Sequence, residues 1–250
     1  MSKSKAAWYV ATVILGLPAA ILAEGDVNVG VGVDFMSKYV WRGQNLVDDW
    51  VFQPSVSAGY KGLTGSIWGN LDLTDENDSA GEFTEVDYSL DYSGSVPGVD
   101  VLGYSIGAIY YDFPGTDLSG TTELYWGFSL DVPASPSITV YHDVDEADGI
   151  YASLGVGHSI EATEKIPVGI DLRASVGWGN AKYNEFYWGT DGSELNDLVL
   201  SVGFPFEVAG VSVTPSVSYI TLLGSDVKDS DAYDTDHSIV VVGVGLSKEF

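Results

Sequence analysis

Carboxylates recur at every second position in several stretches of the chain, and this spacing indicates what chemistry they could carry. Glu85, Asp87 and Asp91 alternate with apolar residues such as Tyr88 and Leu90. In an extended strand this alternation places the three carboxylates on one face. Fixed negative charges along a narrow, water-filled passage attract cations and raise their local concentration.

The same reasoning selects a larger set of candidate pore-lining residues on polar strand faces. These are Asp34, Asp72, Glu85, Asp87, Asp91, Glu123, Asp131, Asp171 and one base, Arg173. The alternative is that the carboxylates pair with Arg173, or hydrogen-bond to one another, inside a filled interior.

No catalytic or cofactor site is expected. The three histidines, His142, His158 and His237, are dispersed, and neither His142 nor His158 has a serine two residues away on its own face. The one G-x-S-x-G match, GYSIG at 103–107, lies inside a predicted strand and is not the strand-to-helix elbow of a hydrolase, so an enzyme like the outer-membrane phospholipases is the weaker interpretation. The absence of cysteine excludes disulfides, thiolate metal sites and a cysteine nucleophile.

An acidic segment at 143–149 has the composition of a calcium-binding loop. It is one residue off the EF-hand spacing, and no helix is expected beside it. Two interpretations stay open. The loop could bind a divalent cation, which could also bridge it to neighbouring lipopolysaccharide, or it could be a solvated loop that keeps strand edges soluble.

The charge balance excludes further classes of protein. The 250 residues include 36 acids and 10 bases, which gives a formal net charge of −26. Such an excess repels phosphate backbones, so nucleic acid is not an expected partner. Hydrophobic residues make up 45% of the chain, enough to bury apolar surface rather than leave the chain disordered.

The first 23 residues have the pattern of an export signal. Lys3 and Lys5 precede an uncharged run at 6–17, Pro18 ends that run, and small residues follow up to Ala23. The run is shorter than the ~20 residues that a membrane-spanning helix needs. We predict a signal peptide at 1–23 and a mature domain at 24–250, which keeps 8 bases and all 36 acids and so has a net charge of −28.

Alternation with period two dominates the chain after residue 26. Val213, Val217 and Tyr219, for example, alternate with Thr214 and Ser216. The pattern predicts twelve strands, at 27–38, 51–61, 63–73, 83–93, 100–112, 121–131, 136–143, 149–160, 166–178, 196–205, 210–221 and 237–250. Most have the length of a tilted membrane strand, about 9–11 residues, rather than the roughly 5–6 of soluble sheets. The expected fold is all-β, a transmembrane antiparallel β-barrel of about 12 strands.

The predicted connections are of two kinds. Long, acidic connections lie at 41–50, 74–82, 112–120, 144–148, 179–195 and 222–236. Short connections rich in Gly or Pro lie near 61–63, 93–99, 132–135, 161–165 and 205–209. Long loops on one side and tight turns on the other are typical of outer-membrane barrels. In such a barrel the apolar strand faces meet lipid and the polar faces line the lumen.

Aromatic residues gather at the predicted strand ends. Trp50 and Phe52 lie at one such end, as expected for the aromatic belt at a membrane interface. We interpret Tyr39, Trp41 and Arg42 as part of this belt with its flanking base. The alternative is a stacking site for a sugar or a receptor ligand.

The chain ends on an aromatic residue, Phe250, in register with the apolar face of the last predicted strand. A terminal aromatic in such a strand resembles the signal read by the outer-membrane assembly machinery, which is therefore an expected partner.

Four short motifs follow one another along the mature chain: SKYVWRG at 37–43, IYYDFPG at 109–115, TELYWG at 122–127 and the final stretch at 244–250. Together they resemble the TorF-type family of porin-like outer-membrane proteins, whose function is largely unassigned. The resemblance covers essentially the whole mature chain. It implies a barrel of about twelve strands with a porin-like role, and it brings no catalytic residues.

These observations predict an outer-membrane channel for passive diffusion of small hydrophilic solutes or ions, favouring cations. Membrane lipid and lipopolysaccharide would surround it. The alternative is a non-conducting barrel whose acidic loops serve adhesion or envelope stability. Glycine and serine on the predicted lumen face favour an open passage, whereas Trp68, Tyr125 and Tyr151 on that face favour a constriction.

Overall fold

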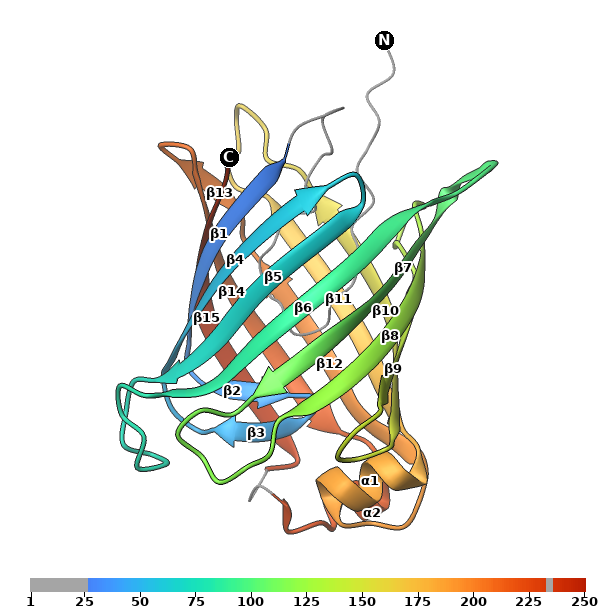
Figure 1. Ribbon diagram of the computed structural model, residues 1–250. Coiled ribbons are helices and arrows are strands. Elements are labelled where there is room, and N and C mark those ends of the chain that lie inside the picture. Colours follow the sequence, from blue (N-terminus) through green and yellow to red (C-terminus); the bar gives the residue numbers. More distant parts are fainter. Residues whose placement is uncertain (1–26, 233–235) are drawn as a thin grey trace.

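A single antiparallel sheet closes on itself as a barrel of twelve strands (Figure 1). The computed structural model describes residues 27–232 and 236–250, so the predicted signal peptide lies outside the described residues. Closure comes from the pairing of β12 with β14. The barrel strands are β1 (Asn28–Met36), β4 (Val51–Tyr60), β5 (Leu63–Asp72), β6 (Phe83–Val96), β7 (Val99–Asp112), β8 (Thr121–Leu130), β9 (Ser137–Asp143), β10 (Ile150–Ile160), β11 (Ile170–Gly179), β12 (Glu194–Gly203), β14 (Val211–Leu222) and β15 (Ser238–Glu249).

All twelve predicted strands are present, and their bounds differ from the prediction by a few residues. The largest difference is at β11, which begins at Ile170 rather than at 166. Pro167 lies between these positions and cannot donate a ladder hydrogen bond, so pairing starts after it.

Five short elements occur in segments that were predicted as connections. They are the strands β2 (Tyr39–Trp41), β3 (Gln44–Val47) and β13 (Phe206–Val208) and the helices α1 (Ala181–Trp188) and α2 (Ser225–Lys228). β2 and β3 pair only with each other and form a separate hairpin. Neither described helix is long and apolar enough to cross a membrane.

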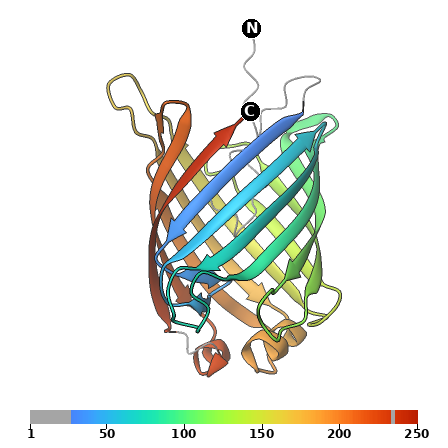
Figure 2. The same cartoon turned by 60° about the vertical axis from the view of Figure 1, so that its left-hand side comes forward.

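The two ends of the barrel differ, as Figures 1 and 2 show. One end, here called the turn end, carries the C-terminus, the start of β1 and tight turns such as the one between Tyr60 and Leu63. The opposite end, here called the loop end, carries α1, α2 and the β2–β3 hairpin. The predicted sorting of long and short connections is therefore present in the fold.

The outer surface of the strands is apolar. Large apolar side chains on alternate positions are exposed around the barrel: Val31, Val56, Ile67, Tyr88, Leu90, Ile106, Leu124, Trp126, Leu154, Val156, Leu172, Leu200, Val240 and Val242. A continuous apolar exterior on a closed barrel is the surface that a lipid bilayer covers.

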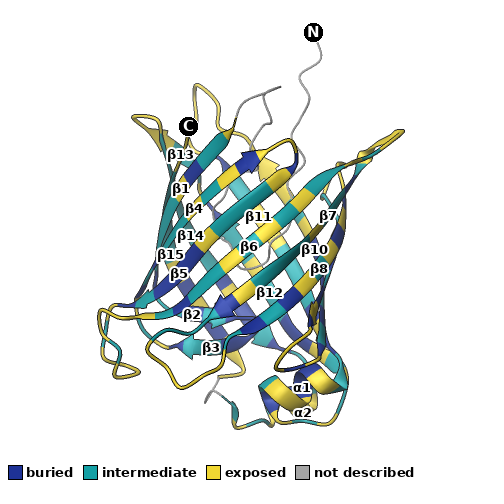
Figure 3. Ribbon diagram, viewed as in Figure 1, coloured by how far each residue is buried: buried dark blue, intermediate teal, exposed yellow. Residues whose placement is uncertain are grey.

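Buried residues concentrate toward the loop end (Figure 3). Trp68, Tyr111, Tyr141 and Tyr151 of the barrel strands form one core cluster there with the hairpin and α1. The interior of the barrel is thus packed with side chains at one end, and this packing positions the candidate site.

Candidate functional site

The β2–β3 hairpin turns on two residues, Arg42 and Gly43. Their φ angles are 48° and 86°, both in the left-handed region that a two-residue type I′ turn requires. Glycine adopts this region freely, whereas an arginine there is uncommon. An arginine at a turn position that favours Asn, Asp or Gly indicates that its side chain has another role.

The hairpin reaches from one part of the barrel wall to another. Its base is held by the ion pair between Lys38 and Asp48. At its tip, a Cβ on Gly43 would lie 2.9 Å from Leu222 Cδ2 and 3.1 Å from the Cβ of Asp197. These residues belong to β14 and β12, so the hairpin crosses the interior of the barrel at its loop end.

The tip is anchored by a buried ion pair. Arg42 Nη1 and Nη2 each donate a hydrogen bond of 2.7 Å to Glu123 on β8, one to each carboxylate oxygen. Both side chains are nearly inaccessible, at 3% and 1% exposed. Tyr111 Oη donates a further hydrogen bond of 2.8 Å to Glu123 Oε2. The forked geometry matches a guanidinium to a carboxylate, which a lysine could not do.

Aromatic rings surround the same guanidinium. The Arg42 Cζ atom lies 4.4 Å from the ring centroids of Trp41, Tyr141 and Tyr151, and 5.8 Å from that of Tyr183. Cation–π attraction is worth about 0.5–1 kcal/mol at exposed sites and about 2 kcal/mol or more when the cation is desolvated. We call Glu123, Tyr111, Tyr141, Tyr151 and Tyr183 the guanidinium cage.

The charge state of Arg42 follows from these neighbours. Burial acts to lower the pKa of the guanidinium, but the adjacent Glu123 carboxylate and the tyrosines raise it by more. The net pKa is well above the ordinary value of an arginine, so Arg42 stays charged at neutral pH.

Other hairpin side chains add contacts on both sides of Arg42. Tyr39 Oη donates a hydrogen bond of 2.9 Å to Glu85 Oε2, and its ring lies 5.5 Å from that of Trp68. The Trp41 ring lies 5.2 Å from that of Tyr187 on α1. The hairpin is therefore fixed by several strands and a helix at once.

The interpretation of Tyr39, Trp41 and Arg42 as part of an interface belt is wrong. All three are buried, at 4%, 7% and 6% exposed, and their partners lie in the barrel interior. The β2–β3 turn carries them away from the lipid-facing surface, a change of direction that the spacing of aromatic residues does not reveal.

Helix α1 covers the cage from the loop end. Asn180 caps it, because its Oδ1 accepts hydrogen bonds from the backbone amides of Tyr183, at 2.9 Å, and Ile150, at 3.0 Å. Gly189 ends the helix in the left-handed conformation. Buried Asn184 joins the helix to the strands by accepting a hydrogen bond of 2.8 Å from Asn196 Nδ2. The Asn and Gly caps were the available signal for this helix, and the prediction missed them.

The predicted carboxylates of β6 occupy different depths of the barrel. Glu85 is buried and accepts from Tyr39, and Asp87 lies two positions further on the same face. Asp91 lies nearer the turn end and accepts a hydrogen bond of 2.7 Å from Tyr125 Oη. The hairpin therefore contacts Glu85 directly and leaves Asp91 beyond it.

The other predicted residues are scattered over the barrel. Asp72 is fully buried and accepts hydrogen bonds from Asn70, Ser79 and Thr84. The rest lie away from the cage: Asp34 partly buried on β1, Asp131 exposed in the turn after β8, Asp171 beside Ser159 on β11, and Arg173 exposed on β11. The structure thus brings Glu85, Asp87 and Glu123 near the hairpin and leaves the remainder elsewhere.

Two buried carboxylates near the hairpin were not among the predicted pore-lining residues. Asp197 on β12 accepts a hydrogen bond of 2.8 Å from Tyr151 Oη. Asp143, at the end of β9, accepts from Thr121 Oγ1 at 2.8 Å and from two backbone amides of the following loop. Because Asp143 Oδ1 accepts from the amides of Asp145 and Ala147, it closes the 143–149 segment as a turn. Among the described residues, no group of three or more potential ligands is arranged to hold a metal ion.

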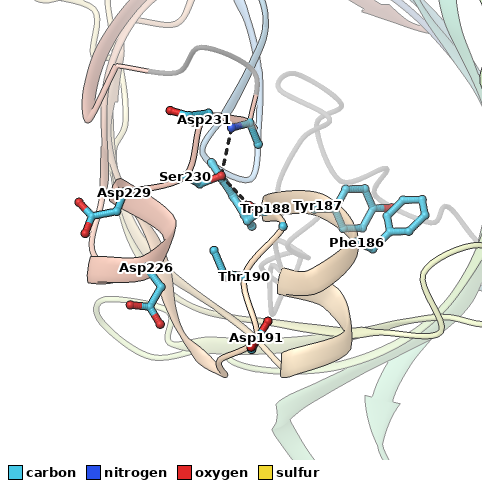
Figure 4. Close-up of a pocket in the computed structure, with 11 residues that line it drawn as sticks. Phe186, Tyr187, Trp188, Thr190, Asp191, Asp226, Asp229, Ser230 and Asp231 are labelled. Atoms are coloured by element: carbon cyan, nitrogen blue, oxygen red, sulfur yellow. Dashed lines mark hydrogen bonds between the residues drawn. The ribbon is translucent and has the colours of Figure 1, made fainter.

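A depression of about 860 Å³ opens between α1 and α2 at the loop end (Figure 4). Trp188 and Thr190 line one side, and Asp226, Asp229 and Asp231 line the other. Ser230 Oγ donates a hydrogen bond of 2.5 Å to the carbonyl oxygen of Trp188 and so ties the two walls together. This acidic depression does not include any residue of the guanidinium cage.

The comparison with one solved structure, the NanC porin, supports the fold. The NanC porin is 12% identical, with 88% of this chain and 98% of that chain aligned and a TM-score of 0.55. Outer membrane phospholipase A from Escherichia coli (12% identity, 89% and 92% aligned) and the channel DcaP of Acinetobacter baumannii (11%, 90% and 96%) have TM-scores of 0.46 and 0.39. No protein-family model matches this sequence. No curated protein matches it either. At these identities the likeness to NanC shows a shared barrel fold alone.

Proposed function

We propose that this chain is a porin-like channel of a bacterial outer membrane that passes small hydrophilic solutes and favours cations. The fold it shares with the NanC porin and its apolar exterior support the location. The TorF-type motifs are consistent with that role, and the terminal Phe250 would be recognised by the outer-membrane assembly machinery. The loop end would then face outward and the turn end would face the periplasm.

One observation carries the preference for cations. Among the described residues that are buried, Arg42 is the one base, whereas five are carboxylates: Asp72, Glu85, Glu123, Asp143 and Asp197. Glu123 already neutralises Arg42. Glu85 shares a strand face with Asp87 and Asp91, and the ionised carboxylates of this face would attract cations into a narrow passage.

The hairpin would set the narrowest point of the passage. It crosses the interior at the loop end, and serines such as Ser57, Ser66 and Ser89 line the strands toward the turn end. A solute would meet the hairpin first and a wider, small-residue vestibule after it.

Reversal potentials in a planar bilayer test the proposal. Under a KCl gradient we expect a reversal potential of cation sign for the refolded protein. The triple variant Glu85→Gln, Asp87→Asn and Asp91→Asn should shift that potential toward zero. The matched control removes the same number of charges from the exposed loop with Asp75→Asn, Glu76→Gln and Asp78→Asn, and it should leave the potential unchanged. Equal shifts in the two variants would overturn the assignment of selectivity to the interior.

The packed hairpin favours a second candidate, a non-conducting barrel whose acidic loops act at the surface. The hairpin contacts β5, β6, β8, β10 and α1 through buried side chains. A folded protein that never conducts, with or without the hairpin, would overturn the channel and favour this alternative.

A further inference from the structure

The guanidinium cage has the composition of a ligand site, although its occupant belongs to the same chain. Glu123 supplies both carboxylate oxygens to one guanidinium, at 2.7 Å each. Tyr141 and Tyr151 present their faces to the same cation at 4.4 Å. A carboxylate combined with several aromatic faces is the arrangement by which proteins recognise organic cations.

The cage is built by the barrel and α1. Tyr111, Glu123, Tyr141 and Tyr151 come from β7, β8, β9 and β10, and Tyr183 comes from α1. Tyr111 orients the Glu123 carboxylate through its own hydrogen bond of 2.8 Å. The walls of the site therefore come from elements other than the hairpin.

The hairpin, in contrast, depends on the cage. β2 and β3 pair with no barrel strand, and Arg42 occupies a left-handed turn position that suits asparagine or glycine better. Local turn preference therefore does not explain the arginine, whereas the forked fit to Glu123 does.

We propose that Glu123 and the tyrosines around it form a guanidinium-binding site in the barrel interior, that Arg42 of the same chain occupies it, and that this occupancy holds the β2–β3 hairpin across the lumen. The site would accept a free guanidinium ion once Arg42 is removed. Its effect on permeation rests on the proposed channel function, but its existence does not.

Ligand binding tests the site. Arg42→Asn retains a residue that tolerates the left-handed turn and removes the guanidinium. We expect saturable binding of guanidinium chloride to this variant, measured by calorimetry in detergent, with potassium chloride at the same ionic strength as the reference. The wild-type protein, whose site is filled, and the double variant Arg42→Asn with Glu123→Gln should show no saturable binding. Arg173→Asn, which removes an arginine outside the cage, is the matched control and should behave like the wild type. Equal heats in all four proteins would overturn the site.

Proteolysis tests whether occupancy holds the hairpin. Chymotrypsin should cut the wild type at exposed aromatic residues such as Trp50 and Phe186 but not after the buried Trp41. In Arg42→Asn we expect cleavage after Trp41 to become several-fold faster. Protection equal to the wild type in the folded variant would show that the pair does not hold the hairpin. If Arg42→Asn does not fold, Arg42→Lys takes its place, because it keeps the positive charge and loses only the forked pair of donors. Faster cleavage after Trp41 in this variant would support the proposal. Protection of Trp41 equal to that in the wild type would contradict it.

Both measurements are independent of conduction. A protein that passes them but carries no current would overturn the channel function and leave the guanidinium site intact. A protein that conducts but shows neither guanidinium binding nor faster cleavage after Trp41 would overturn the guanidinium site and leave the channel function intact.

Discussion

The Arg42 guanidinium donates two hydrogen bonds of 2.7 Å to the carboxylate of Glu123, a residue 81 positions later in the chain. This pair joins the first loop-end connection to β8, four strands along the sheet from β4. Because of this contact between distant segments, the hairpin lies inside the barrel rather than on its surface.

Removing the two partners of this pair should have unequal effects on stability. Glu123→Gln leaves a buried guanidinium without its counter-charge, which typically costs about 3–5 kcal/mol. Arg42→Asn leaves Glu123 with its hydrogen bond from Tyr111 and should cost less. Urea unfolding of the refolded barrel, followed by the heat-modifiable shift in electrophoretic mobility, measures both. In the double variant we expect less than the sum of the two losses, and strict additivity would contradict a direct coupling.

Gly177 should be needed for the wall behind the hairpin. A Cβ at this position would lie 2.6 Å from Tyr151 Cζ and would collide with the Tyr151 hydroxyl and the Asp197 carboxylate. We expect Gly177→Ala to destabilise the barrel by about 1–3 kcal/mol, the usual cost of overpacking.

Gly157→Ala is the matched control for that substitution. Its Cβ would meet only Leu172 O at 3.5 Å and Arg173 Cγ at 3.8 Å, which are ordinary contacts. Equal urea midpoints for the two variants would contradict the role given to Gly177.

The Asn180 cap should control the order of α1. Asn180→Ala removes the acceptor for the amides of Tyr183 and Ile150, at an expected cost of about 1 kcal/mol. Amide hydrogen exchange should accelerate in α1 and leave the barrel strands unchanged. Asn180→Asp keeps an acceptor oxygen and should preserve the protection of the α1 amides from exchange. Loss of that protection in Asn180→Asp would contradict the capping role of Asn180.

The barrel could be predicted from the sequence because its signal is local. Alternation with period two, strand length and the contrast between long and short connections each act over about ten residues. They identified all twelve strands and the difference between the two ends. The bounds shifted by a few residues where a proline or a turn decides where pairing begins, as at Pro167.

The candidate site could not be predicted in the same way. Whether Arg42 lies at a membrane interface or in a cage depends on Glu123 and Tyr151, which are far away in sequence and become neighbours only when the barrel closes. The short hairpin had one local signal, the Arg-Gly pair in a two-residue turn, and α1 had two, the caps at Asn180 and Gly189. Asp143 and Asp197 lie next to predicted loops, where an acid is ordinarily solvated.

The base of the hairpin should respond to acid. Hydrogen bonds from Lys38 and Asn45 lower the pKa of Asp48 below its ordinary value, although the group is largely exposed. A carboxyl with a lowered folded pKa stabilises the fold above its unfolded pKa, and that contribution is lost as the pH falls through the folded value, below ~3.9. An NMR titration of Asp48 should give a midpoint under that of a free aspartate. Lys38→Met should raise the midpoint, and high salt should raise it partly; a midpoint that Lys38→Met leaves in place would contradict the pairing.

The most direct test of the account is the current carried by the folded wild-type protein in a planar bilayer under a KCl gradient. A heat-modifiable mobility shift first establishes that the barrel is folded. We expect stepwise conductance with a reversal potential of cation sign, because buried carboxylates outnumber buried bases among the described residues. An inserted, folded barrel that carries no current, or one whose reversal potential has anion sign, would contradict it.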